Sequence, residues 1–282
     1  MATLTDLRKR LRGVQTICQL AGAMRTVSSA KLSRLNALTG AYAPYAQGCR
    51  ELLAASGALL PPGEGGAGKT LVILLSGNRG LCGSYHNELF AYFRSLMEPE
   101  KQCYIPCGKM AAAWCREKGI PVLEEFSVPD VPEFPQAEAL ADSALRLYTS
   151  GEVSRVLFVY GEAVNALRQE PRCVELLPGA DPAVSGPGQP SDSLPGDTLW
   201  VPDLPTAQAG LVDFCLRARV WSLLLKGAQG VQGATLVSMR SAYDNGKKSA
   251  AALETAINRM RQTQVTAGVI ETSSGYGTRE EG

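Results

Sequence analysis

The sequence predicts an α/β protein in which long N- and C-terminal helices form an antiparallel coiled coil beside an open α/β domain. Three observations support this fold class. Residues 1–60 and 206–274 carry coiled-coil spacing, residues 68–177 alternate strand and helix patterns, and residues 178–205 are rich in proline and glycine. We expect these four segments to be the domains of the 282-residue chain, with 178–205 as a linker.

The N-terminal segment has the apolar spacing of a helix that packs along a partner helix. Apolar residues recur at steps of three and four from Leu4 to Ala21. The seam is then expected to drift onto Ile17, Leu20, Met24 and Val27, and later onto Leu32 and Leu35. Pro44 is expected to kink the helix and Pro61-Pro62 to stop it. A helix of about 55 residues would span roughly 80 Å, so it needs a partner along its length.

The C-terminal segment supplies that partner. Heptads counted from Leu211 to Ile270 give eighteen seam positions, of which thirteen are apolar. Two such long helices at opposite ends of one chain are expected to pair with each other. They must run antiparallel if the α/β unit joins them at one end.

Residues 68–177 alternate between strand and helix patterns, which is typical of an open α/β sheet. The expected strands are residues 71–76, 102–106, 121–126, 155–161 and 172–177, of which 121–126 is the weakest. The expected helices are residues 85–97, 110–119 and 136–150.

Composition excludes several classes of function. The net charge is +1, but residues 1–40 and 206–265 are basic and residues 61–205 are acidic. Basic ends suit nucleic acid or an acidic protein, and the lack of aromatic residues in the first 40 positions argues against nucleic acid. No apolar run is long enough to insert into a membrane. The eight cysteines are scattered and His86 is the only histidine, so no metal or cofactor is expected.

Two glycine clusters suggest different chemistry. Residues 63–70, GEGGAGKT, match the P-loop pattern G-x-x-x-x-G-K-[ST]. A P-loop follows a strand and opens a helix, whereas this segment precedes the strand, so a flexible linker ending at Lys69 is the favoured interpretation. Residues 76–83, SGNRGLCG, have the correct order and form a loop after a strand, where α/β folds bind ligands and partners.

Residues 76–83 resemble the Ser-x-Asp-Arg-Gly-Leu-Cys-Gly signature of the gamma subunit of F-type ATP synthases, the central rotor shaft. Two further segments resemble motifs of that family in the same order along the chain. The matching positions are Val14, Ala23, Met24, Val27 and Lys31 near the N-terminus, and Met239, Asp244, Asn245, Asn258, Arg259, Met260, Arg261, Gln262 and Thr266 near the C-terminus.

The resemblance implies a role for each part of the chain. The coiled coil would pass through the ring of alpha and beta subunits, and a Rossmann-like α/β domain would contact the epsilon subunit and the membrane c-ring. The chain would transmit torque at the cytoplasmic face of the cell membrane, as a non-catalytic subunit without a cofactor. The residues implied to contact other subunits are Met24, Arg25, Arg79, Gly80, Leu81, Cys82, Gly83, Asp244, Asn245, Asn258, Arg259, Arg261 and Gln262.

Several positions depart from the family pattern. Gly22 replaces a lysine, Asn78 an aspartate, Val231 a glutamate and Thr235 an arginine. Three glycines between residues 227 and 233 each add a helix penalty of about 1 kcal/mol relative to alanine. Two alternatives therefore stand beside the rotor shaft: a diverged paralogue with an assembly or regulatory role, and a P-loop nucleotidase.

Overall fold

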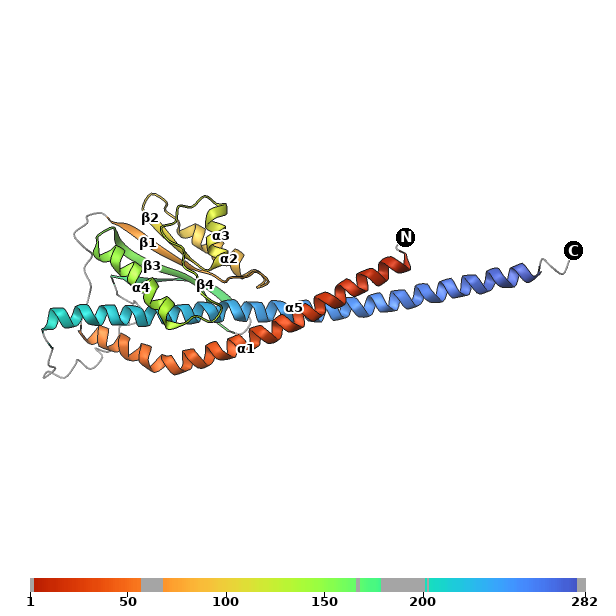
Figure 1. The fold of residues 1–282 in the computed structure, drawn as a ribbon, viewed down its shortest axis with the longest axis horizontal. Coiled ribbons are helices and arrows are strands. Elements are labelled where there is room, and N and C mark those ends of the chain that lie inside the picture. Colours follow the sequence, from red (N-terminus) through yellow and green to blue (C-terminus); the bar gives the residue numbers. More distant parts are fainter. Residues whose placement is uncertain (1–2, 57–67, 166–167, 179–200, 202, 278–282) are drawn as a thin grey trace. The chain divides into compact units, whose positions relative to one another are not determined.

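The structure is a computed structural model that describes residues 3–56, 68–165, 168–178, 201 and 203–277. Along the chain (Figure 1) the elements are α1 (Leu4–Ser56), β1 (Lys69–Leu75), α2 (Tyr85–Leu96), β2 (Gln102–Cys107), α3 (Lys109–Glu117), α4 (Phe134–Thr149), β3 (Val153–Ala163), β4 (Gln169–Leu177) and α5 (Leu204–Gly277). The predicted fold class, long terminal helices with an α/β sheet, is confirmed. Pro61-Pro62 and most of the expected linker 178–205 lie outside the described residues.

The chain divides into two compact units, Met1–Val27 with Val237–Gly282, and Ser28–Leu236. Both α1 and α5 contribute residues to each unit. Helix α1 continues past Pro44, as predicted, whereas the kink expected at Pro44 stays a prediction. The domain boundaries predicted from the sequence, at residues 60, 68, 178 and 206, stay a prediction.

The larger unit contains a four-stranded sheet of order β2-β1-β3-β4. Strand β1 pairs in parallel with β2 and β3, whereas β4 pairs antiparallel with β3. The expected strand at 121–126 is wrong: it makes only the isolated bridges Tyr104–Val122 and Cys107–Phe126. A proline at its start and two consecutive glutamates disfavour a regular strand there.

Helices cover both faces of this sheet. Leu71, Ile73 and Leu75 of β1 pack in one core cluster with residues of α4 and α5. Val72 and Leu74, which point the other way, pack with residues of α2 and α3. Figure 1 shows the same layers, with α2 and α3 on one side of the sheet and α4 and α5 on the other. Burial on both faces explains why β1 is apolar without alternation.

Within the larger unit, α1 and α5 run antiparallel. The contacting pairs are Asn36–Gln229, Tyr42–Trp221, Tyr45–Phe214 and Cys49–Cys215. In the first pair Gln229 Nε2 donates to Asn36 Oδ1 at 2.9 Å, and in the last pair Cys215 Sγ lies 3.3 Å from the Cys49 carbonyl. Between Asn36 and Cys49 on α1, the partner on α5 moves back from Gln229 to Cys215. This is the antiparallel pairing that the two seams predict.

The smaller unit shows the same antiparallel pairing. Cys18 Sγ lies 4.0 Å from the carbonyl oxygen of Tyr243. A Cβ on Gly246 would collide with Cys18 Sγ, and a Cβ on Gly22 would lie 3.4 Å from the Tyr243 ring. Small residues at these positions therefore let the two helix axes approach closely.

Around Cys18 and Ala21 the seam of α1 keeps its original spacing, and the later predicted position Leu35 is confirmed as buried. Its buried positions include Cys18, Ala21, Ser28 and Leu35. Ile17 and Leu20 are each 58% exposed and Val27 is 45% exposed, so the predicted drift onto these three residues is wrong. The set of positions that includes Cys18 and Ala21 and the set that includes Ile17, Leu20 and Val27 are both spaced by three and four residues. The set with the smaller side chains is the one that is buried.

Two glycines of α5 allow close contact with the sheet. A Cβ on Gly227 would collide with the Leu75 side chain, and a Cβ on Gly230 with the carbonyl oxygen of Gly161. At Gly233 the nearest atom, Gln169 Nε2, would be at an ordinary distance of 3.5 Å. The helix penalty of Gly227 and Gly230 is thus offset by packing that alanine would prevent.

Candidate functional site

The candidate site is the loop 76–83, which joins the carboxyl end of β1 to the first turn of α2. Its exposed tip consists of Arg79, Gly80 and Leu81, whereas Cys82 is buried. Leu81 has a φ of 66° and Gly83 a φ of 63°. The left-handed conformation costs a leucine roughly 1–2 kcal/mol, so the surrounding contacts must hold the tip in place.

Ser76 anchors the start of the loop to the next strand and helix. Its Oγ accepts a hydrogen bond from the Ala111 amide at 2.8 Å and lies 3.3 Å from the Cys107 carbonyl, to which it can donate. Gly108 has a φ of 91°, and a Cβ there would collide with the Ser76 carbonyl oxygen. These contacts fix where the loop leaves the sheet.

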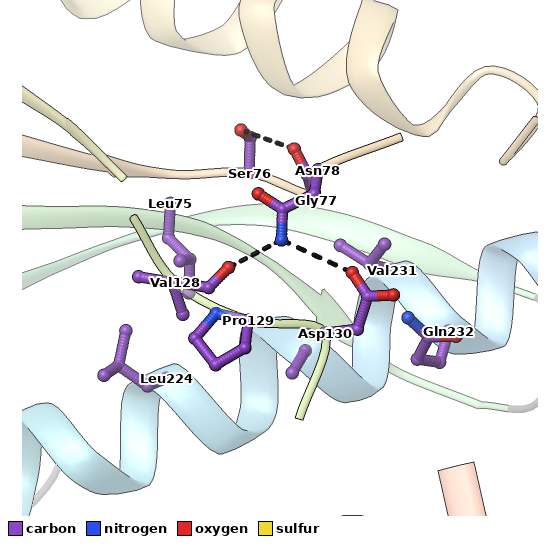
Figure 2. A pocket seen from close by; sticks show the side chains of 11 residues that line it. Leu75, Ser76, Gly77, Asn78, Val128, Pro129, Asp130, Leu224, Val231 and Gln232 are labelled. Atoms are coloured by element: carbon purple, nitrogen blue, oxygen red, sulfur yellow. Dashed lines mark hydrogen bonds between the residues drawn. The ribbon is translucent and has the colours of Figure 1, made fainter. Parts of the chain in front are cut away.

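Asn78 ties the loop to the segment 128–130 (Figure 2). Its Nδ2 donates to the Val128 carbonyl at 2.6 Å and lies 3.4 Å from Asp130 Oδ1. Its Oδ1 accepts from the Lys109 amide at 3.1 Å. An aspartate at position 78 would bring a second carboxylate to Asp130 and lose both donated bonds. Asparagine therefore fits next to Asp130 and the Val128 carbonyl better than the aspartate that the family has at this position.

Asp130 also binds helix α1. Its Oδ2 lies 2.6 Å from Lys31 Nζ. Burial alone would raise the pKa of the Asp130 carboxyl, but the hydrogen bond and charge of Lys31, with the Asn78 amide, outweigh it. The pKa of Asp130 therefore lies below its ordinary value, and the carboxylate stays charged at neutral pH.

A shallow hollow lies beside Asn78 (Figure 2). Its interior volume is only about 20 Å³, and its lining is mainly apolar, with Leu224 and Val231 contributed by α5. Pockets for small molecules usually measure about 300–1,000 Å³, most of it shielded from solvent. This hollow is better suited to part of a side chain than to a nucleotide.

The P-loop-like segment does not have phosphate-binding geometry where it is described; its residues 63–67 lie outside the described part. The Lys69 amide donates to the Glu152 carbonyl at 3.2 Å and the Thr70 amide to the Lys101 carbonyl at 2.8 Å. Amides bonded to carbonyls in a sheet are not available to cradle phosphate.

The described residues contain neither a candidate metal-binding cluster nor a candidate membrane span. No group of three or more His, Cys, Asp or Glu side chains is placed there to hold a metal ion. None of the helices there has a stretch long and apolar enough to cross a membrane.

The remaining predicted contact residues lie in the smaller unit. Arg25 Cζ lies 4.9 Å and Lys247 Nζ 4.8 Å from the centroid of the Tyr243 ring. Tyr243 thus holds two cations and also fills the space beside Gly22, where the family has a lysine. Met24 is half-buried. The exposed residues of the set are Asp244, Asn245, Asn258, Arg259, Arg261 and Gln262.

Arg79, Gly80, Leu81, Cys82 and Gly83 fall in the larger unit, and the other predicted residues fall in the smaller one. Sequence reasoning missed three residues that organise them. Tyr243 could have been suspected as the aromatic residue directly before the Asp244-Asn245 motif, and His86 as the only histidine, three residues after the loop. Asp130 gave no signal, because nothing in its local sequence connects it with residue 78.

Antiparallel terminal helices, an inserted α/β unit and an anchored loop with an exposed basic tip define a helical-shaft protein. The model of the ATP synthase family matches residues 3–278. The chain belongs to the ATP synthase gamma chain family.

Individual relatives agree over the full length. The ATP synthase gamma chain of Desulfitobacterium hafniense is 29% identical over 99% of this chain and 100% of its own. That of Chlorobaculum tepidum is 30% identical over 98% of both chains. The family resemblance carried by the loop and the two helix motifs is confirmed.

Solved structures confirm the fold. A chain of the Euglena gracilis mitochondrial ATP synthase, in a structure of OSCP, F1 and c-ring, has a TM-score of 0.68 at 17% identity, covering 98% of this chain and 94% of that one. A chain from the rotor of the same enzyme has a TM-score of 0.65 at 16% identity, covering 93% and 98%.

Proposed function

We propose that this chain is the rotor shaft of a proton-translocating F-type ATP synthase, transmitting torque between the membrane c-ring and the catalytic subunits. The observation that carries the proposal is the antiparallel pairing of α1 with α5 in both compact units. Two helices that share a buried seam resist twisting and bending better than one helix of the same length. The full-length match to gamma chains supports the same role.

The surfaces of the two units suit a part that turns inside a ring. Ile17, Leu20 and Val27 leave an apolar stripe on α1, and the basic tip of the loop carries Arg79. Contacts that must form and break in each turn have to be weak, and exposed ion pairs of about 0.2–1 kcal/mol have this character. We assign these contacts to the alpha and beta subunits.

We assign residues 1–60 and 206–274 to the shaft, residues 68–177 to a base that contacts the epsilon subunit and the c-ring, and 178–205 to a linker. The complex would lie at the cytoplasmic face of the cell membrane, with this chain as a peripheral part. The chemistry of ATP would belong to the catalytic neighbours, and the chain itself would be non-catalytic.

Co-expression with alpha, beta and epsilon subunits, in a host that lacks its own gamma subunit, tests the proposal. The chain should co-purify with these subunits, and membrane vesicles should recover ATP hydrolysis and ATP-driven proton pumping. Failure to assemble would refute the shaft role. Assembly and hydrolysis without pumping would instead support the diverged paralogue.

A matched pair of variants tests the loop. Arg79→Ala is expected to lower the pumping rate without preventing assembly. Lys101→Ala removes another exposed basic residue, next to the amino end of β2 at the opposite edge of the parallel strands, and should leave pumping unchanged. Equal effects of the two substitutions would contradict the assignment of Arg79.

A further inference from the structure

His86 lies buried under the loop, in the first turn of α2, with 6% of its surface exposed. Its Nε2 is 3.1 Å from the carbonyl oxygen of Arg79. Because a carbonyl can only accept, Nε2 must carry the proton and donate. Its Nδ1 is buried and has no hydrogen-bond partner in the described part of the chain, so it is the unprotonated nitrogen of a neutral ring.

Aromatic packing fixes the plane of this ring. The imidazole stacks on Phe90 at a centroid distance of 5.7 Å and an interplanar angle of 16°, and Phe90 stacks in turn on Trp114 of α3 at 5.0 Å. On the loop side, a Cβ added to Gly77 would lie 3.3 Å from His86 Cε1 and 2.8 Å from Val231 Cγ1. The ring therefore fills the space between α2 and the loop.

We propose that His86 is the positioning residue of the Arg79 loop: its neutral imidazole holds the Arg79 carbonyl and thereby fixes the direction in which Arg79 and Leu81 project. Ser76 and Asn78 anchor the start of the loop, and His86 anchors its tip. The consequence for torque rests on the proposed rotor function, whereas the consequence for loop order does not.

The same geometry makes the anchor sensitive to acid. The titratable groups near the ring are Tyr85 on α2 and Cys82 in the loop, while Phe90 on α2, Trp114 on α3 and Val231 on α5 bring no charge. Burial lowers the pKa of His86, and the Arg79 carbonyl opposes this only in part.

The sign of the pH effect follows from that lowered pKa. A second proton would sit on Nδ1, which has no acceptor in the described structure. A histidine with a lowered folded pKa loses its stabilising contribution as the pH falls below the unfolded value of about 6.5. The loop is therefore expected to loosen as the pH falls through that value.

Amide hydrogen exchange on the full chain tests the positioning role. His86→Phe keeps a ring to stack on Phe90 but removes the donor, whereas His86→Gln keeps an amide donor. Losing one hydrogen bond should raise exchange in residues 79–83 about five- to tenfold in His86→Phe, with residues 88–96 unchanged and His86→Gln close to the native chain. Unchanged exchange at 79–83, or equally faster exchange along α2, would overturn the proposal.

Two further measurements separate loop positioning from a purely structural role. Between pH 7.5 and 5.5, after correction for intrinsic exchange rates, the native loop should lose protection and the His86→Gln loop should not; identical pH profiles would overturn the proposal. In the assembled complex, His86→Phe should slow proton pumping in the native background but not in an Arg79→Ala background. A faster-exchanging loop with unchanged pumping would support loop positioning and refute the torque role of Arg79.

Discussion

Replacing Gly230 by alanine measures how tightly α5 packs against the sheet. The new Cβ would collide with the carbonyl oxygen of Gly161 on β3, a backbone atom that cannot rotate aside as a side chain can. Overpacking of this kind costs about 1–3 kcal/mol. Alanine regains about 1 kcal/mol of helix propensity over glycine, so the free energy of unfolding should fall by up to about 2 kcal/mol.

Gly210→Ala is the matched control, because a Cβ at Gly210 meets no atom within 4 Å. Both substitutions lie in α5 and gain a similar helix propensity, so the difference between the two variants isolates the collision, about 1–3 kcal/mol. Urea unfolding of the full chain, followed by circular dichroism, measures both free energies. If Gly230→Ala proves as stable as Gly210→Ala, the close approach of α5 to β3 is refuted.

Three further predictions concern other contacts. Lys69→Ala should leave ATP binding to the chain unchanged in equilibrium dialysis, because the neighbouring amides are bonded within the sheet; loss of binding would revive the nucleotidase. Asp130→Asn should lower the free energy of unfolding at pH 7 by about 1–2 kcal/mol, by breaking the ion pair with Lys31. Because the pKa of Asp130 is lowered, the difference in unfolding free energy between the native chain and Asp130→Asn should persist down to about pH 3.9 and disappear as the pH falls further. A difference that does not change with pH in urea titrations would contradict the ion pair. Tyr243→Leu should destabilise the chain by about 1 kcal/mol through loss of its contacts with Arg25 and Lys247, whereas Tyr243→Phe should not, and equal thermal shifts would argue against cation–π stabilisation.

The helices and most strands were predictable because they depend on local periodicity. The run 71–76 is apolar on both faces, and the spacing from Leu4 to Ala21 repeats every seven residues, so both patterns have few alternatives. The strand predicted at 121–126 was wrong because its first residue is a proline and its two consecutive glutamates disfavour a regular strand. The antiparallel direction of β4 depends on its short connection to β3, not on its own residues.

The candidate site was predictable only in part. The order of strand, glycine loop and helix placed Arg79 at the carboxyl end of β1, as observed. The anchors of the loop lie far from it in sequence: Asn78 meets Asp130, and Asp130 meets Lys31. Such partners come together only when the chain folds, so no local pattern could identify them.

The sequence alone determined that two long helices must pair and that an α/β unit lies between them in the chain, because repeated apolar spacing requires a partner surface. Only the tertiary structure decided which of two similarly spaced sets of apolar residues on α1 is buried, and why α5 carries glycine at positions 227 and 230. Spacing shows that a helix has an apolar face, whereas the size and shape of the opposing surface select which face packs.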